Sequence, residues 1–87
     1  MGQFEKALFR ILSGTSDSNI MFADLQNVLE RLKFNCRIRG DHFIYTKDRV
    51  EDIINIQPLK DMAKAYQVKQ VRNIILKYKM GGDSDEI

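Results

Sequence analysis

The sequence has few of the residues that small domains use for covalent or metal cross-links. It contains one cysteine, Cys36, and one histidine, His42, so it holds neither an internal disulfide nor a paired CxxC or HxxxH zinc motif. It also has no run of 18 apolar residues and no apolar N-terminal stretch of the signal-peptide kind. We therefore expect a cytoplasmic domain with no membrane segment, no metal and no small-molecule cofactor.

The chain is short, which limits the kind of site it can build. Its 87 residues and 10.2 kDa correspond to one small domain. A domain of this size hides only about 60 to 65% of its unfolded surface, so the core needs most of the 44% of residues that are apolar. A deep substrate pocket is therefore not expected.

The net charge of +2 conceals an uneven distribution. The last seven residues hold three of the 12 acidic residues and none of the 14 basic ones, so residues 1–80 carry a net charge of +5. Residues 59–80 alone contain six basic residues and one acidic residue. A basic surface of this kind is compatible with a nucleic-acid partner.

Apolar residues recur at helical spacing in three segments, which cover residues 1–14, 22–33 and 68–79. The polar stretch between the first two segments predicts a loop at residues 13–19. Gly81 and Gly82 are expected to end the last helix. We predict that residues 81–87 form a disordered acidic tail.

Between the second and third helical segments the apolar period changes from 3.6 to 2. The predicted strands cover residues 34–39, 42–46 and 53–56, and a basic loop follows at residues 59–64. Because short turns join these strands, they must pair as an antiparallel meander. The predicted fold is α+β, with a three-stranded antiparallel sheet covered on one face by the second and last helices. These two layers form a domain over residues 20–80, and residues 1–14 add an N-terminal helix.

The order of these features resembles the HicA toxin family, which has an α-β-β-β-α core like that of the double-stranded-RNA-binding domain. The resemblance covers about two-thirds of the chain and is carried by residues 32–34 (LKF), 39–45 (RGDHFIY), 55–58 (NIQP) and 66–72 (YQVKQVR). The family signature, usually Gly-Ser-His-His, begins the second strand. Gly40 and His42 match its glycine and first histidine, whereas Asp41 and Phe43 replace its serine and second histidine.

HicA toxins are ribosome-independent mRNA endonucleases, and the resemblance implies that His42 is the catalytic residue. It also implies that mRNA is the substrate and that a HicB-type antitoxin is the protein partner. Metal-independent RNA cleavage moves a proton from a 2′-hydroxyl and another to the departing 5′-oxygen, and imidazole can act in either step at neutral pH. Asp41 would favour the protonated imidazole but would also repel a phosphate. The alternative is that His42 is an ordinary polar residue on an exposed strand face.

Basic side chains near the predicted turn and in the last helix are candidate contacts to RNA phosphates. These candidate RNA-binding residues are Arg37, Arg39, Gly40, Lys64, Lys69 and Arg72, with Gly40 allowing close approach of the RNA backbone. The charged members are explained equally by solvated outer faces of a strand and a helix. Phe43 and Tyr45 either stack on bases or belong to the core, and we expect at least one in the core.

Three functional hypotheses follow from these patterns. The first is a HicA-like endoribonuclease that uses His42 as a general acid or base. The second is a catalytically inactive RNA-binding module on the same fold, suggested by the replaced serine and second histidine. The third is a protein-interaction domain in which residues 1–14 dock on a partner or a second copy, although packing of that helix on its own core is the favoured interpretation.

Overall fold

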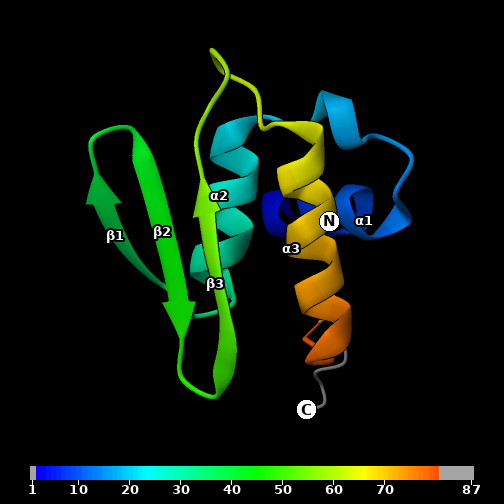
Figure 1. Ribbon diagram of the computed structural model, residues 1–87. Helices are drawn as coiled ribbons and strands as arrows, with labels where there is room; N and C mark the ends of the chain where they lie inside the picture. Colours follow the sequence, from blue (N-terminus) through cyan, green and yellow to red (C-terminus); the bar gives the residue numbers. More distant parts are fainter. Residues whose placement is uncertain (1, 81–87) are drawn as a thin grey trace.

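The structure, a computed structural model, describes residues 2–80. Along the chain it contains helix α1 (Gln3–Ser13), the short 3-10 helix η1 (Asp17–Asn19), helix α2 (Phe22–Arg31), strands β1 (Asn35–Arg39), β2 (His42–Lys47) and β3 (Val50–Ile56), and helix α3 (Ala65–Lys77) (Figure 1). The chain is therefore α+β, as its sequence predicts. The predicted acidic tail, residues 81–87, lies outside the described residues.

The three strands form an antiparallel sheet in the order β1-β2-β3. A two-residue turn of Gly40 and Asp41 joins β1 to β2, and the cross-strand pair Arg39 and His42 closes it. Gly40 has φ of +64°, a left-handed conformation that glycine adopts without strain at the first position of such a turn.

Strand β3 begins at Val50, three residues before the predicted strand. Lys47 pairs with Val50 beyond an irregularity in the β2 register between Tyr45 and Lys47. Polar residues Glu51 and Asp52 weaken the apolar alternation there. Within residues 2–80, β3 is an edge strand, and charged residues are common on such strands. Strand β3 is therefore longer than the stretch of alternating apolar residues from which it was predicted.

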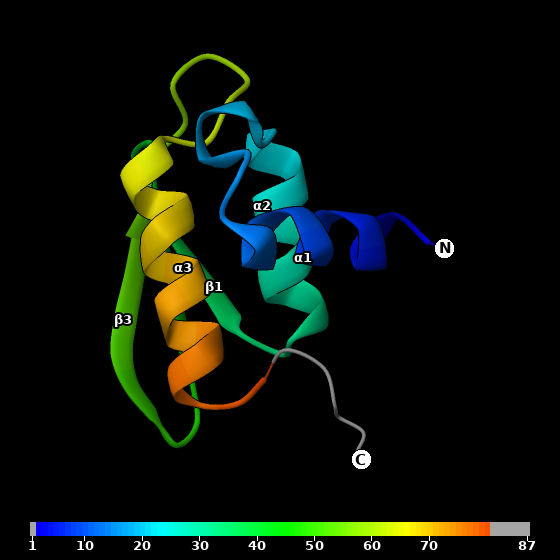
Figure 2. The ribbon, with the colours of Figure 1, turned by 90° about the vertical axis from the view of Figure 1, so that its right-hand side faces the viewer.

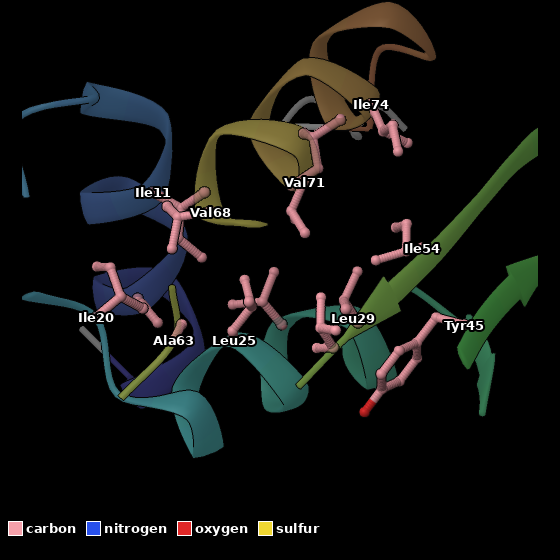
Figure 3. Close-up of a cluster of buried hydrophobic side chains, with 14 of the residues drawn as sticks. Ile11, Ile20, Leu25, Leu29, Tyr45, Ile54, Ala63, Val68, Val71 and Ile74 are labelled. Carbon is pink, nitrogen blue, oxygen red and sulfur yellow. The ribbon is translucent and has the colours of Figure 1, made fainter. Parts of the chain in front are cut away.

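Helices α2 and α3 cover one face of the sheet and leave the other face open (Figures 1 and 2). Alternation along β2 directs Phe43 and Tyr45 toward the helices and His42 and Ile44 toward the open face. Tyr45 is fully buried and belongs to the same core cluster as Leu29 of α2 (Figure 3). Burial raises the pKa of its phenol, to which Gln26 donates a hydrogen bond of 3.4 Å. At least one of the two aromatic residues thus belongs to the core, as expected.

Helix α1 lies across the helical layer on the side away from the sheet (Figure 2). It buries Ala7 and Ile11 in the same core as α2 and α3, and its C-cap residue is Gly14, which has φ of +74°. The guanidinium of Arg31 lies 4.9 Å from the centroid of the Phe4 ring, which attaches the start of α1 to α2. The apolar stripe of α1 therefore packs within the molecule.

Helix α3 has different limits from the predicted residues 68–79. It begins at Ala65, three residues before the predicted start. The added residues are helical but do not belong to the apolar stripe from which the start was predicted. It ends at Lys77, where Lys79 adopts φ of +57° and donates to Leu76 O while Met80 donates to Ile75 O. This pair of bonds is a Schellman motif, so a lysine terminates the helix before the glycines that were expected to do so.

Candidate active site

His42, the first residue of β2, lies at the end of the sheet that also holds the β1–β2 turn and the end of β3 (Figure 1). Its side chain is 48% exposed on the open face. Asn55 of β3 pairs with Ile44, so its side chain emerges on the same face. The imidazole Nδ1 of His42 lies 3.1 Å from Asn55 Oδ1, at hydrogen-bonding distance.

The other ring nitrogen faces a carboxylate. His42 Nε2 lies 3.7 Å from Asp41 Oδ1, and the Asp41 side chain is 67% exposed. Gln57 donates a hydrogen bond of 2.6 Å to Asp41 Oδ2 and accepts one of 3.5 Å from Lys64 Nζ. The bond from Gln57 lowers the pKa of the Asp41 carboxyl, and the nearby charges of His42 and Lys64 act in the same direction. The five residues Asp41, His42, Asn55, Gln57 and Lys64 are called the His42 cluster below.

A buried glutamine supports the His42 cluster from inside the protein. Gln67 of α3 is 1% exposed, and in the amide orientation that satisfies both of its polar atoms it donates to Gln57 O at 3.2 Å and accepts from Gln57 N at 3.0 Å. These two bonds replace a strand partner for Gln57 just beyond the end of β3. The backbone that carries the Gln57 side chain toward Asp41 is therefore attached to α3.

Four of the candidate RNA-binding residues lie at or near the His42 cluster. Arg39 pairs with His42 across the β1–β2 ladder and Arg37 pairs with Ile44, so both emerge on the open face. A shallow hollow of about 330 Å³ lies beside Arg37, between β1 and β2. Lys64 belongs to the cluster itself. Apart from its two chain neighbours, no described residue has an atom within 4 Å of the position that a Cβ on Gly40 would occupy, so the turn has space for a ligand.

The remaining two candidates lie elsewhere on α3. Lys69 borders a hollow of about 430 Å³ between β3 and α3, together with Asp52 and Tyr66. Arg72 Nη1 donates to Asp17 Oδ1 at 2.8 Å and to Ile11 O at 3.2 Å, and its side chain is 15% exposed. The partners of Arg72 thus lie outside the His42 cluster, and Arg72 joins α3 to α1 and η1.

Three residues of this arrangement were not among the sequence-predicted site residues: Asn55, Gln57 and Gln67. Asn55 interrupts an apolar run, and Gln57 follows two residues later, so strand alternation could have placed both on the open face. Gln67 precedes Val71 by four residues and so occupies an apolar-stripe position of α3. A polar residue at such a position was the signal for a buried hydrogen-bonding role.

Within residues 2–80, no three His, Cys, Asp or Glu side chains are grouped closely enough to hold a metal ion. No helix of this part of the chain is both long and apolar enough to cross a membrane. Comparisons with protein-family models, with curated proteins and with solved structures found no match to the chain.

Proposed function

We propose that this protein is a metal-independent endoribonuclease of the HicA type that cleaves mRNA in the cytoplasm, on a fold of the double-stranded-RNA-binding-domain kind. His42 is its general acid–base residue. The observation that carries the proposal is the exposed His42 imidazole, which contacts Asn55 on a sheet face that also presents Arg37 and Arg39. A histidine held beside basic side chains is suited to proton transfer at a phosphate.

An extended polymer suits this site better than a small molecule. The hollow of about 330 Å³ on this face is lined by Arg37 and Ile44 but not by His42, and the His42 side chain is 48% exposed. An RNA strand laid across β1 and β2 would place a phosphate near Arg37 and Arg39, whose planar guanidinium groups bind phosphate oxygens in pairs. Such contacts position the backbone without reading its sequence.

The proposed reaction needs one proton acceptor close to the 2′-hydroxyl. His42 Nε2 removes the 2′-hydroxyl proton, the O2′–P bond forms and the P–O5′ bond breaks, which leaves a 2′,3′-cyclic phosphate. The departing 5′-oxygen takes a proton from water, and the imidazolium returns its own proton to the solvent. Arg37 and Arg39 stabilise the negative charge that develops on the phosphoryl oxygens.

The proposal includes a protein partner. A HicB-type antitoxin that covers the open face would block access of RNA to His42. Among residues 2–80, no strand pairs with the outer edge of the exposed strand β1, which leaves room for such a protein beside the site.

A second candidate function is an RNA-binding module without catalysis. The Asp41 carboxylate favours this alternative, because a charge 3.7 Å from His42 Nε2 repels a phosphate that approaches the same nitrogen. In this case the basic side chains would supply all of the affinity, and binding would weaken steeply with salt.

The two candidates are separated by incubating the purified protein with a fluorogenic RNA and comparing His42→Ala with Thr46→Ala. Thr46 is exposed on the same face of the same strand, so its variant is a matched control. We expect His42→Ala to lower the cleavage rate by about 100-fold or more. Thr46→Ala should retain the wild-type rate, and both variants should bind RNA.

Cleavage by His42→Ala at the wild-type rate would show that the catalytic assignment is wrong. RNA that binds the wild-type protein in a salt-dependent manner but stays intact would favour the binding module. Induction of the wild-type chain in cells should arrest growth, whereas induction of His42→Ala should not.

A further inference from the structure

We propose that Asn55 is a positioning residue that keeps a proton on Nδ1 of His42 and so makes Nε2 the nitrogen that exchanges protons with RNA. Asp41 faces the other side of the ring, where its carboxylate stabilises an imidazolium but also repels a phosphate that approaches Nε2. The catalytic part of this inference rests on the proposed function, whereas the state of the imidazole can be tested without RNA.

In the orientation that the structure gives the Asn55 amide, its oxygen faces Nδ1 of His42, and this contact allows only one direction of donation. The Asn55 amide oxygen is solely an acceptor, so a hydrogen bond at 3.1 Å requires that Nδ1 carry the proton. A neutral imidazole has one N–H, and Nε2 therefore keeps its lone pair. The other tautomer would direct the Nδ1 lone pair at the Asn55 oxygen, 3.1 Å away, which is repulsive. The Asp41 carboxylate favours a proton on Nε2 instead, but it acts from the longer distance of 3.7 Å.

The sheet determines where the Asn55 side chain lies. Asn55 pairs with Ile44 in the ladder between β2 and β3, and His42 lies two residues before Ile44 on the same face. Diagonal neighbours of this kind are within reach of long side chains. The Asn55 oxygen is thus presented to the imidazole by paired backbone and not by a loop.

Asp41 is placed to stabilise charge on Nε2 without occupying its lone pair. The distance of 3.7 Å from Nε2 to Asp41 Oδ1 is too long for a hydrogen bond, yet it is short for a charge interaction. When Nε2 takes a proton, the carboxylate faces the resulting imidazolium. The bond of 2.6 Å from Gln57 and the nearby charge of Lys64 favour the ionised carboxylate.

In a nucleophile–histidine–carboxylate triad, one carboxylate both orients the histidine and stabilises its charged form. Here Asn55 and Asp41 divide these two tasks. One acceptor fixes the tautomer, and a separate carboxylate stabilises the charged ring. Arg39 is the other charged residue that the ladder places beside His42, and as a cation it opposes the effect of Asp41 while attracting the phosphate. Loss of Asn55 would leave the ring free to rotate and to exchange tautomers.

The test is the ¹⁵N NMR spectrum of the imidazole in protein labelled at histidine, recorded without RNA at a pH where the ring is neutral. His42 is the one histidine of the chain, so its two nitrogen signals need no assignment by mutation. We expect the Nδ1–H tautomer to predominate in the wild-type protein and in the control Thr46→Ala. Asn55→Ala should shift the population toward Nε2–H, whereas Asn55→Asp, which keeps an acceptor, should retain Nδ1–H.

A wild-type spectrum dominated by Nε2–H, or an Asn55→Ala spectrum equal to that of the wild type, would overturn the inference. Amide spectra of each variant verify that the sheet is intact, as expected for an exposed position.

Cleavage kinetics test the catalytic part. Asn55→Ala should lower kcat by roughly 10- to 100-fold with little change in KM, and Asn55→Asp should recover part of kcat. If the wild-type protein leaves RNA intact while the tautomer responds to Asn55→Ala, the endoribonuclease proposal fails and the role of Asn55 in orienting His42 stands. If RNA is cleaved but the tautomer does not respond, the role of Asn55 fails alone.

Discussion

Two polar clusters, both linking segments that are distant in sequence, have opposite surroundings. Arg72 of α3 bonds to Asp17 of η1 at 2.8 Å and to a carbonyl of α1, and the two charged side chains are only 15% and 23% exposed. In the His42 cluster the charged group Asp41 lies 3.7 Å from the imidazole, and both side chains are about half or more exposed. The first cluster is closed by its own partners, whereas the second retains access for a ligand.

The comparison shows that residue type alone does not predict whether a basic side chain holds the fold together or stays available to bind a ligand. Arg72, Arg37 and Arg39 carry the same group, but Arg72 uses Nη1 to hold α1 and η1 on α3. Arg37 and Arg39 lie on an open face beside His42. Partial burial strengthens the charge interaction of Arg72 with Asp17, whereas exposure leaves Arg37 and Arg39 available to bind a ligand.

The largest expected effect is on the support beneath the His42 cluster. Gln67→Leu leaves the N–H and C=O of Gln57 without their partners, so we expect a loss of about 2 to 4 kcal/mol in the free energy of unfolding. Urea denaturation measures it, and Gln70→Leu on the same helix is the control. A cost no greater than that of Gln70→Leu would show that Gln67 does not hold the end of β3.

The next effect tests the closed cluster. Arg72→Leu removes the partly shielded pair with Asp17 and the bond to Ile11 O, and we expect a loss of about 1 to 2 kcal/mol in stability. Because Arg72 lies apart from the His42 cluster, the cleavage rate per folded molecule should stay unchanged. Thermal melts and a cleavage assay at low temperature measure the two quantities. A variant of normal stability that loses RNA affinity would reverse the roles assigned to the two clusters.

A smaller effect is expected on the salt dependence of RNA binding. Arg37→Ala and Arg39→Ala should each reduce the slope of log affinity against log salt by about 1, because each side chain is expected to neutralise one phosphate. Lys6→Ala, which removes one charge from the exposed surface of α1, is the matched control. Fluorescence anisotropy at several salt concentrations provides the slopes, and equal slopes for all three variants would place the RNA elsewhere.

The smallest effect concerns the Asp41 carboxyl. Gln57→Ala removes the hydrogen bond that does most to lower the pKa of Asp41, so that pKa should rise toward its ordinary value. A lowered carboxyl pKa stabilises the fold above the ordinary value of about 3.9 and loses this contribution as the pH falls through the folded-state pKa. ¹³C NMR titration of the Asp41 carboxyl measures the change, with Gln26→Ala as control. An unchanged titration would show that Gln57 does not lower the pKa of the Asp41 carboxyl.

Much of the fold was predictable because the spacing of apolar residues within one segment indicates whether that segment is a helix or a strand. The order of helices and strands, the antiparallel meander and the helix-facing side of β2 all follow from apolar spacing. The limits of β3 and α3 were not predicted, because the pairing of Val50 with Lys47 and the left-handed Lys79 leave no apolar signal. Element ends depend on turns and caps, which local patterns describe poorly.

The candidate site was only partly predictable. Alternation was sufficient to place Arg37 and Arg39 on one face, and the neighbourhood of Asp41 and His42 follows from their adjacency. The contact of His42 with Asn55 needs the β2–β3 register, which an irregularity after Tyr45 shifts. The burial of Arg72 needs the position of α1, which no pattern in α3 records.

By itself, the sequence determined which residues are available for chemistry: one histidine, and more basic than acidic residues within residues 1–80. It also determined that side chains along each strand alternate between the core and the solvent. Only the tertiary structure decided which of these residues have partners. Arg72 meets Asp17 across 55 residues, and Gln57 meets Asp41 across 16. Such bonds require two backbones to be brought together by packing and strand register, and side-chain identity alone contains neither.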